Sequence, residues 1–265
     1  RYHVLDAPII SDGEYDRLLH ELKAIEAEHP EWITPDSPSQ RAGAPPADKF
    51  DKVRHPGPIL SLANAFGAED TFAWFERVSK LDERVRDAQF TVEPKIDGLT
   101  VVLHYRDGIF VQGATRGDGE IGEDISANLK TIRAIPLRIP VNSNQSSVDS
   151  EQEQLSFIKG SQSLNTEYSI PEYLVVRGEV FITHKDFDTL NQHLSEAGEK
   201  TYQNPRNTAA GALRQLDSRV TATRPLTLLV YHIVYAEGGE VPNSQWDRLE
   251  YLRELGFPVS TDSRR

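Results

Sequence analysis

Nine residues of this chain, TVEPKIDGL from Thr91 to Leu99, bring a lysine close to two carboxylates. Glu93 and Lys95 are two positions apart, so they share one face of a strand, and Asp97 follows directly. A lysine beside carboxylates can act as a covalent nucleophile when burial or a neighbouring cation lowers its pKa enough to supply the free amine. The competing interpretation is a hairpin turn at Asp97-Gly98 with a solvated lysine, and the segment taken alone favours it.

Two further segments carry residues that suit contacts with phosphate. Thr115 to Gly119, TRGDG, places an arginine and an aspartate in a glycine-bearing connection, which is also an ordinary composition for a turn. From Asn204 to Pro225 the charged residues are four arginines against the single Asp217, and arginine forks suit phosphate oxygens. The alternative is that these arginines pair with acids elsewhere in the fold.

The first element expected to position these residues is an N-terminal helix. Asp12 is a suitable cap, apolar residues follow at helical spacing, and His29-Pro30 ends the helix. The apolar residues are Tyr15, Leu18, Leu19, Leu22 and Ile25. The polar, proline-rich stretch from Thr34 to Pro58 predicts a surface linker. We therefore expect a small helical domain over residues 1–46 and a second domain over residues 47–265.

The second domain is predicted to mix helices with antiparallel strands. An apolar stripe predicts a helix from Glu69 to Arg86, and a long polar stretch from Asn142 to Ser169 predicts a surface insertion. Asp-Gly pairs predict an antiparallel meander of three strands, over Gln89–Pro94, Leu99–Tyr105 and Ile109–Ala114. The remaining elements are expected to be a strand over Tyr173–Ile182, a helix from Thr183 to Gly198, a helix over Pro205–Leu216, a strand over Leu226–Tyr235 and a last helix ending at Gly256. This order indicates an α+β fold rather than a doubly wound α/β sheet.

Composition excludes several classes of protein. The 265 residues include 41 acidic and 29 basic side chains, which argues against a protein that grips nucleic acid through bulk positive charge. The chain has no cysteine, hence no disulfide framework and no thiolate zinc site, and it has no Gly-x-x-x-x-Gly-Lys-Ser/Thr loop, which excludes a P-loop ATPase. No apolar run approaches the ~20 residues of a membrane span, and no signal peptide is recognisable, so we expect a cytoplasmic protein. Because the chain opens at Arg1 and contains no methionine, we also expect it to be part of a longer protein.

Taken together, the motifs resemble a known family. Lys-x-Asp-Gly after Glu-Pro is the signature of polynucleotide ligases and capping enzymes, whose lysine becomes linked to a nucleotide. Several further segments are similar to the NAD⁺-dependent DNA ligases of bacteria, and the resemblance covers nearly the whole chain apart from the polar insertion. These segments are Tyr2–Pro8, Asp12–Leu18, Thr34–Pro38, Leu60–Phe66, Ala114–Gly119, Val176–Phe181 and Asn204–Asn207.

The resemblance implies a nucleotidyltransferase (adenylation) domain with antiparallel sheets, preceded by a small helical domain. It implies that Lys95 attacks the adenylyl phosphate of NAD⁺ and releases nicotinamide mononucleotide, while cations offset the charge that develops on the phosphate. By the same resemblance, Arg116 contacts the nucleotide, and Asp97 and Asp118 support the lysine and a magnesium ion.

The resemblance also implies how the rest of NAD⁺ and the DNA are bound. Glu93 would contact the adenine and Glu179 the ribose, although a plain outward charge on a strand is the alternative for Glu179. Ser61 and Leu62 would line the same pocket. Nicotinamide mononucleotide would be bound through aromatic faces and carboxylates by Tyr2, His3, Asp12, Tyr15 and Asp16, for which the alternative is a capped surface helix. The DNA backbone would be contacted by Arg206 and Arg214.

Complete members of this family carry two later lysine motifs and several further domains, which are not found in these 265 residues, where Lys200 is the last lysine. We therefore expect the parent protein to be a monomeric NAD⁺-dependent ligase that seals nicked double-stranded DNA in replication and in the repair of DNA damage. The present chain alone is expected to adenylate itself poorly and to seal no nick. Two alternatives stay open: a non-catalytic nucleotide-binding or DNA-docking module, and an ATP- or GTP-dependent nucleotidyltransferase. The segment from Tyr2 to Asp16 disfavours the second, because ligases that use ATP lack it.

Overall fold

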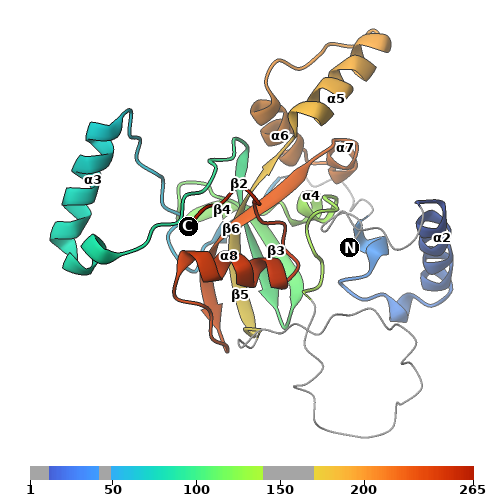
Figure 1. The fold of residues 1–265 in the computed structure, drawn as a ribbon. Coiled ribbons are helices and arrows are strands. Elements are labelled where there is room, and N and C mark those ends of the chain that lie inside the picture. The colour runs from blue at the N-terminus through green and yellow to red at the C-terminus, as the bar shows by residue number, and fades with distance from the viewer. Residues whose placement is uncertain (1–11, 42–48, 140–169) are drawn as a thin grey trace, which may run out of the picture.

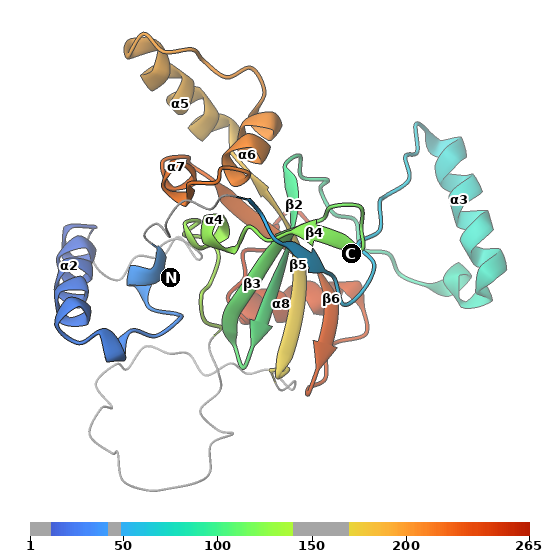
Figure 2. The ribbon, with the colours of Figure 1, turned by 180° about the vertical axis from the view of Figure 1, so that it is seen from behind.

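The protein is described by a computed structural model over residues 12–41, 49–139 and 170–265. Its centre is a four-stranded antiparallel sheet in the order β3-β2-β5-β6 (Figures 1 and 2). The strands are β2 (Leu99–Arg106), β3 (Ile109–Thr115), β5 (Tyr173–Phe181) and β6 (Thr227–Glu237). Two short strands, β1 (Lys52–Arg54) and β4 (Ile121–Glu123), form a separate antiparallel pair. Antiparallel strands with helices between them along the chain confirm the predicted α+β class.

The hairpin of β2 and β3 forms where the sequence predicts it. Asp107 and Gly108 have φ angles of 48° and 74°, which a two-residue turn with the twist of a hairpin requires. The strand predicted over residues 89–94 is wrong, because this segment makes only one isolated bridge, between Val92 and Arg264. The meander therefore has two strands before β5 instead of three.

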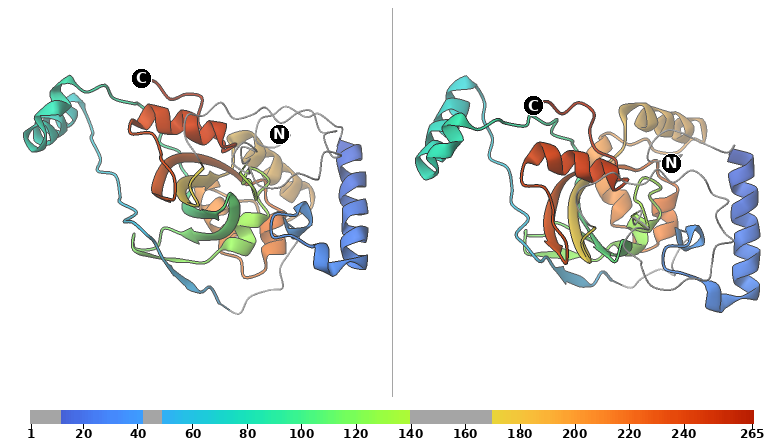
Figure 3. Two further views of the ribbon diagram at one scale, coloured as in Figure 1. Left: turned by 90° about the horizontal axis from the view of Figure 1, so that it is seen from below. Right: turned by 60° about the horizontal axis from the view of Figure 1, so that its bottom comes forward.

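The main core lies on one face of the sheet. Val101, Leu103 and Tyr105 alternate along β2 toward this face and are essentially buried. Helix α8 (Gln245–Glu254) packs across the sheet there, and α4 (Ser126–Lys130) extends the same core (Figure 3). The opposite face carries the alternate residues of the strands and faces the β1–β4 pair (Figure 2). The polar side chains that line the cavity described below lie on this second face.

Three helices gather at one end of the sheet: α5 (His184–Glu196), α6 (Pro205–Leu213) and α7 (Ser218–Ala222) (Figure 1). Thr183 caps α5 by accepting a hydrogen bond from the Asp186 backbone, as its position predicts. The next predicted helix ends at Leu213 instead of Leu216, because the chain leaves helical geometry and Asp217 starts a new cap for α7.

Helix α2 (Asp12–Glu28) ends before His29-Pro30 as predicted, but Asp12, the expected cap, is its first residue. Two short 3₁₀ helices follow it, η1 (Pro30–Trp32) and η2 (Pro38–Arg41). The predicted linker is more ordered than expected, because Ser37 donates to Glu26 of α2 at 2.5 Å while Arg41 reaches backbone carbonyls next to α4. The expected boundary at residue 46 and the polar insertion lie outside the described residues.

Helix α3 (Ala68–Leu81) is shorter than predicted, and the 3₁₀ helix η3 (Glu83–Asp87) follows it. The helix ends because Asp82 leaves helical geometry and its carboxylate accepts a hydrogen bond from the Arg84 backbone. The expected apolar stripe is largely open, with Phe72 70% and Leu81 84% exposed. Helices α3 and α2 stand on opposite sides of the sheet (Figures 1 and 3). Among the described ranges, no helix is long and apolar enough to cross a membrane.

Candidate active site

A cavity of about 710 Å³ opens on the face of the sheet opposite α8. Its wall is built from β2, β5, the turn after β3, the β1–β4 pair and α6. Four cationic and three acidic side chains line it: Lys52, Arg116, Arg206, Arg214, Asp118, Glu123 and Glu179. Such a wall suits a ligand that carries both phosphates and hydroxyl groups.

Glu179 is the buried carboxylate of this cavity, with 7% of its surface exposed. It pairs with Thr100 across β5 and β2, so both side chains point to the cavity face. One oxygen, Oε2, accepts hydrogen bonds from the Thr100 hydroxyl at 2.9 Å and the Tyr231 hydroxyl at 3.3 Å. Burial raises the pKa of Glu179, and these hydrogen bonds together with the charge of Lys95 oppose that rise. The interpretation of Glu179 as an outward solvated charge is therefore wrong.

Lys95 lies in the irregular segment that leads into β2, not on a strand. Its side chain is exposed, so the burial that we considered for a nucleophilic lysine is absent in this state. Its charge nevertheless acts on Glu179, which places the two groups in one electrostatic site. Asp97 forms an exposed ion pair with Arg206 at 3.2 Å.

Gly98 explains why the Asp97-Gly98 pair is not a hairpin turn. A Cβ atom at this glycine would lie 2.1 Å from the carbonyl oxygen of Val180, so only glycine lets the chain pass β5 so closely. The turn predicted at this position is wrong, and the glycine instead brings the lysine-bearing segment against the sheet.

Glu93 is half-buried and lies on the same irregular segment. Its Oε1 accepts a hydrogen bond of 2.8 Å from the Nε2 of Gln245, the first residue of α8. Burial raises the pKa of Glu93, and the Gln245 bond opposes the rise.

The turn from Arg116 to Gly119 is fixed by its own backbone. Gly117 and Gly119 have φ angles of 58° and 104°, which favour glycine. Asp118 accepts hydrogen bonds from the backbone of the next residues at 2.9 and 2.8 Å, which lowers its pKa. Arg116 donates to the Ser61 hydroxyl at 3.2 Å. The structure therefore brings Arg116 and Ser61 together, whereas Leu62 is 73% exposed.

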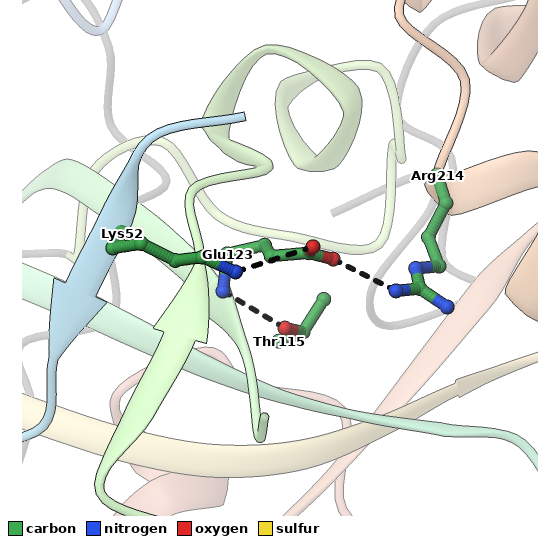
Figure 4. A network of polar contacts seen from close by, with 4 residues as sticks. All are labelled: Lys52, Thr115, Glu123 and Arg214. Atoms are coloured by element: carbon green, nitrogen blue, oxygen red, sulfur yellow. Dashed lines mark hydrogen bonds and ion pairs between the residues drawn. The ribbon is translucent and has the colours of Figure 1, made fainter. Parts of the chain in front are cut away.

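Arg206 and Arg214 both line the cavity, and each is paired with an acid. Figure 4 shows Glu123 of β4 between Arg214, at 3.0 Å, and Lys52 of β1, at 3.5 Å, while its backbone donates to the Thr115 hydroxyl. Arg214 holds the pKa of Glu123 below its usual value. The alternative interpretation, in which these arginines pair with acids, thus describes both Arg206 and Arg214 in the structure.

Sequence reasoning missed several residues of this site, namely Lys52, Thr100, Glu123, Tyr231 and Gln245. Period-two alternation along β5 and β6 could have placed Tyr231 on the cavity face, but Glu123 becomes relevant only because β4 pairs with β1. Tyr2 and His3 lie outside the described residues, as do the side chains of Asp12, Tyr15 and Asp16.

No three His, Cys, Asp or Glu side chains gather closely enough to hold a metal ion in the part of the chain that the structure describes. One oxygen of Asp118 is engaged by backbone amides, and Asp97 is paired with Arg206. A magnesium ion that keeps its waters and binds phosphate oxygens needs only one or two such carboxylates.

Comparison with known proteins decides the family. The model of the NAD-dependent DNA ligase adenylation domain matches residues 47–168 and 158–265, and the model of the DNA ligase-like N-terminal NAD⁺-binding domain matches residues 1–43. The chain belongs to the NAD-dependent DNA ligase family. This confirms the resemblance drawn from the motifs.

Several relatives of this chain, each named DNA ligase, match it over its whole length. The DNA ligase of Roseiflexus castenholzii is 50% identical over 265 residues, that of Chloroflexus aurantiacus 52% over 264 residues, and that of Methylococcus capsulatus 48% over 265 residues. In each case the match covers 100% of this chain and 35% of the relative. The chain therefore spans about a third of the length of these ligases.

Proposed function

We propose that this chain performs the nucleotide-uptake step of an NAD⁺-dependent DNA ligase. The Lys95 amine, once it has lost its proton, forms a bond to the adenylyl phosphorus of NAD⁺. The phosphoanhydride bond breaks, nicotinamide mononucleotide leaves with the electron pair, and AMP stays on the lysine. In the complete protein, AMP passes to the 5′-phosphate of nicked double-stranded DNA, and the 3′-hydroxyl displaces it to join the strands.

The observation that carries this proposal is the cavity with four cationic side chains beside the Lys95 segment, in a chain of this family. Negative charge spreads over the phosphate oxygens as the lysine attacks, and cations that are already in place stabilise it without reorganisation. We assign this role first to Arg116, which the Ser61 hydroxyl and the rigid Arg116–Gly119 turn hold at the cavity.

Carboxylates are assigned to the groups of the nucleotide that donate hydrogen bonds. Glu179 is proposed to accept from the ribose and Glu93 from the adenine. Leu62 would pack on the bound nucleotide, which agrees with its large exposure in the structure. Nicotinamide mononucleotide is assigned to Tyr2, His3, Asp12, Tyr15 and Asp16, as the family resemblance implies.

Magnesium and DNA complete the proposal. Asp97 and Asp118 would hold magnesium together with phosphate oxygens and water, and the ion would supply further charge neutralisation. Arg206 and Arg214 would exchange their present acidic partners for DNA phosphates. We further propose that the full-length protein is a monomeric cytoplasmic enzyme.

Intact mass spectrometry after incubation with NAD⁺ or with ATP tests the proposal. We expect one added adenylate from NAD⁺ alone, formed slowly and absent in Lys95→Ala. Addition from ATP but not from NAD⁺ would favour an ATP-dependent nucleotidyltransferase. Binding of NAD⁺ without any adduct, even after long incubation, would favour a non-catalytic nucleotide-binding module.

A further inference from the structure

The segment that carries Glu93 has no strand ladder to orient it. In residues 89–98 the only backbone pairing within the described ranges is at Val92, which exchanges hydrogen bonds of 2.8 and 2.9 Å with Arg264. That pairing fixes the backbone one residue before Glu93 but not the direction of the carboxylate. The contact that does reach the carboxylate comes from Gln245.

Gln245 is itself firmly placed. It begins helix α8, where the Ser244 side chain caps the helix by accepting from the Asp247 backbone at 3.1 Å, and α8 packs into the main core. The Gln245 Nε2 donates to Glu93 at 2.8 Å and to the carbonyl oxygen of Tyr231 at 2.9 Å. The side-chain amide nitrogen carries two hydrogens, and these two bonds use both of them. The amide group therefore cannot flip without losing both hydrogen bonds.

Tyr231 of β6 also links Glu93 to the side of the site that we assign to the ribose. Tyr231 accepts from Gln245 through its backbone and donates to Glu179 through its hydroxyl at 3.3 Å. Glu93, Gln245, Tyr231 and Glu179 thus form one continuous chain of hydrogen bonds across β6. Glu179 is fixed on β5, and this chain of hydrogen bonds ties the Glu93 carboxylate, which lies on an irregular segment, to the same part of the fold.

We infer that Gln245 is a positioning residue that occupies Oε1 of Glu93 and leaves Oε2 to accept a hydrogen bond from the exocyclic amino group of the adenine, so that the site selects adenine over a 6-oxopurine. This inference rests on the proposed function, in which Glu93 contacts the base. A 6-oxopurine such as hypoxanthine presents an acceptor where adenine presents an amino donor, and a carboxylate cannot donate to it.

The electrostatics of Glu93 act in the same direction. Burial raises the pKa of this carboxyl, and the Gln245 bond is the contribution that lowers it. No charged side chain of the described residues contributes to that shift. Without Gln245 a larger share of Glu93 is protonated at a given pH, and a protonated carboxyl can donate to a 6-oxo group.

Calorimetric titration of the chain with NAD⁺ and with nicotinamide hypoxanthine dinucleotide tests this inference. In Gln245→Leu we expect NAD⁺ to bind about tenfold more weakly, as for the loss of one hydrogen bond to a charged group, with a smaller preference for NAD⁺ over the hypoxanthine analogue. The pH below which NAD⁺ binding declines should also move upward. Gln192→Leu is the matched control, because Gln192 donates to Glu196 at 2.9 Å on the exposed side of α5 and should leave all three quantities unchanged.

A double-mutant cycle separates positioning from general damage to the fold. If Gln245 acts through Glu93, then adding Gln245→Leu to Glu93→Gln causes little further loss of NAD⁺ affinity, whereas independent losses would multiply. Multiplying losses, or an unchanged preference for adenine in Gln245→Leu, would overturn the inference while leaving the proposed function intact. Failure of the unaltered chain to bind either dinucleotide would instead overturn the proposed function, and this inference with it.

Discussion

Replacing Glu179 by glutamine should separate the stability of this protein from its binding of nucleotide. The Thr100 and Tyr231 hydroxyls both donate to Oε2 of Glu179. If the carbonyl oxygen of the glutamine takes that place, both hydrogen bonds are kept and the side-chain volume is unchanged. The other oxygen, which we assign to the ribose, becomes an NH₂ group that donates instead of accepting.

The loss can be estimated from that single exchange. A hydrogen bond to a charged group contributes about 1.5–3 kcal/mol, and about 1.4 kcal/mol corresponds to a factor of ten in affinity. Glu179→Gln should therefore weaken NAD⁺ binding by roughly 10- to 150-fold. The exposed fraction of Glu179 is 7%, so solvent offers little compensation for the missing acceptor.

Stability should change in the opposite direction. Burial raises the pKa of Glu179, so the folded state holds this proton more tightly than the unfolded chain does. Ionisation above the ordinary value of 4.5 therefore lowers the free energy of unfolding of the native protein, and glutamine avoids this loss. We expect Glu179→Gln to be at least as stable as the native protein at pH 7, with the difference shrinking as the pH falls toward 4.5.

Calorimetric titration with NAD⁺ and urea unfolding at several pH values measure the two effects. Thr100→Val is a useful companion, because it removes one donor to Glu179 and should weaken binding less than Glu179→Gln does. NAD⁺ affinity within twofold of the native value in Glu179→Gln, or a clear loss of stability at pH 7, would refute this reasoning.

Two further predictions concern the framework around the site. Arg41→Leu removes hydrogen bonds of 3.2, 2.9 and 2.8 Å to the carbonyls of Lys130, Ile132 and Ile135, so urea unfolding should show that the free energy of unfolding falls by about 2–4 kcal/mol. Arg41→Lys should recover less than half of this loss. An unchanged unfolding midpoint in Arg41→Leu would contradict the anchoring role of Arg41. Burial lowers the pKa of His104 to about 4, so on acidification the unfolded chain binds a proton at a higher pH than the folded protein does. The free energy of unfolding should therefore fall as the pH drops from 6.5 toward 4, and His104→Gln should make this fall smaller. Equal slopes of stability against pH in the two proteins would rule out this histidine as the cause.

The sequence by itself determined the elements whose signals act over a few residues. The cap at Thr183, the turn at Asp107-Gly108 and the helical spacing in Asp12–Glu28 each fix local backbone geometry, and each element formed where predicted. The motif around Lys95, together with the other segments that resemble the family, likewise predicted the family that the comparisons show.

Only the tertiary structure decided how the candidate site is assembled. Gly98 looked like a turn residue but serves the close passage of the chain beside Val180, a steric demand set by a strand some eighty residues away. Glu93 is held by Gln245, 152 positions later, and Glu123 meets Arg214, 91 positions later. Hydrogen bonds and ion pairs depend on distances of about 3 Å, which local spacing does not constrain once the chain has folded back on itself. The sequence therefore determined which groups are available for chemistry, and the packing of β5, β6 and α8 determined which of them meet.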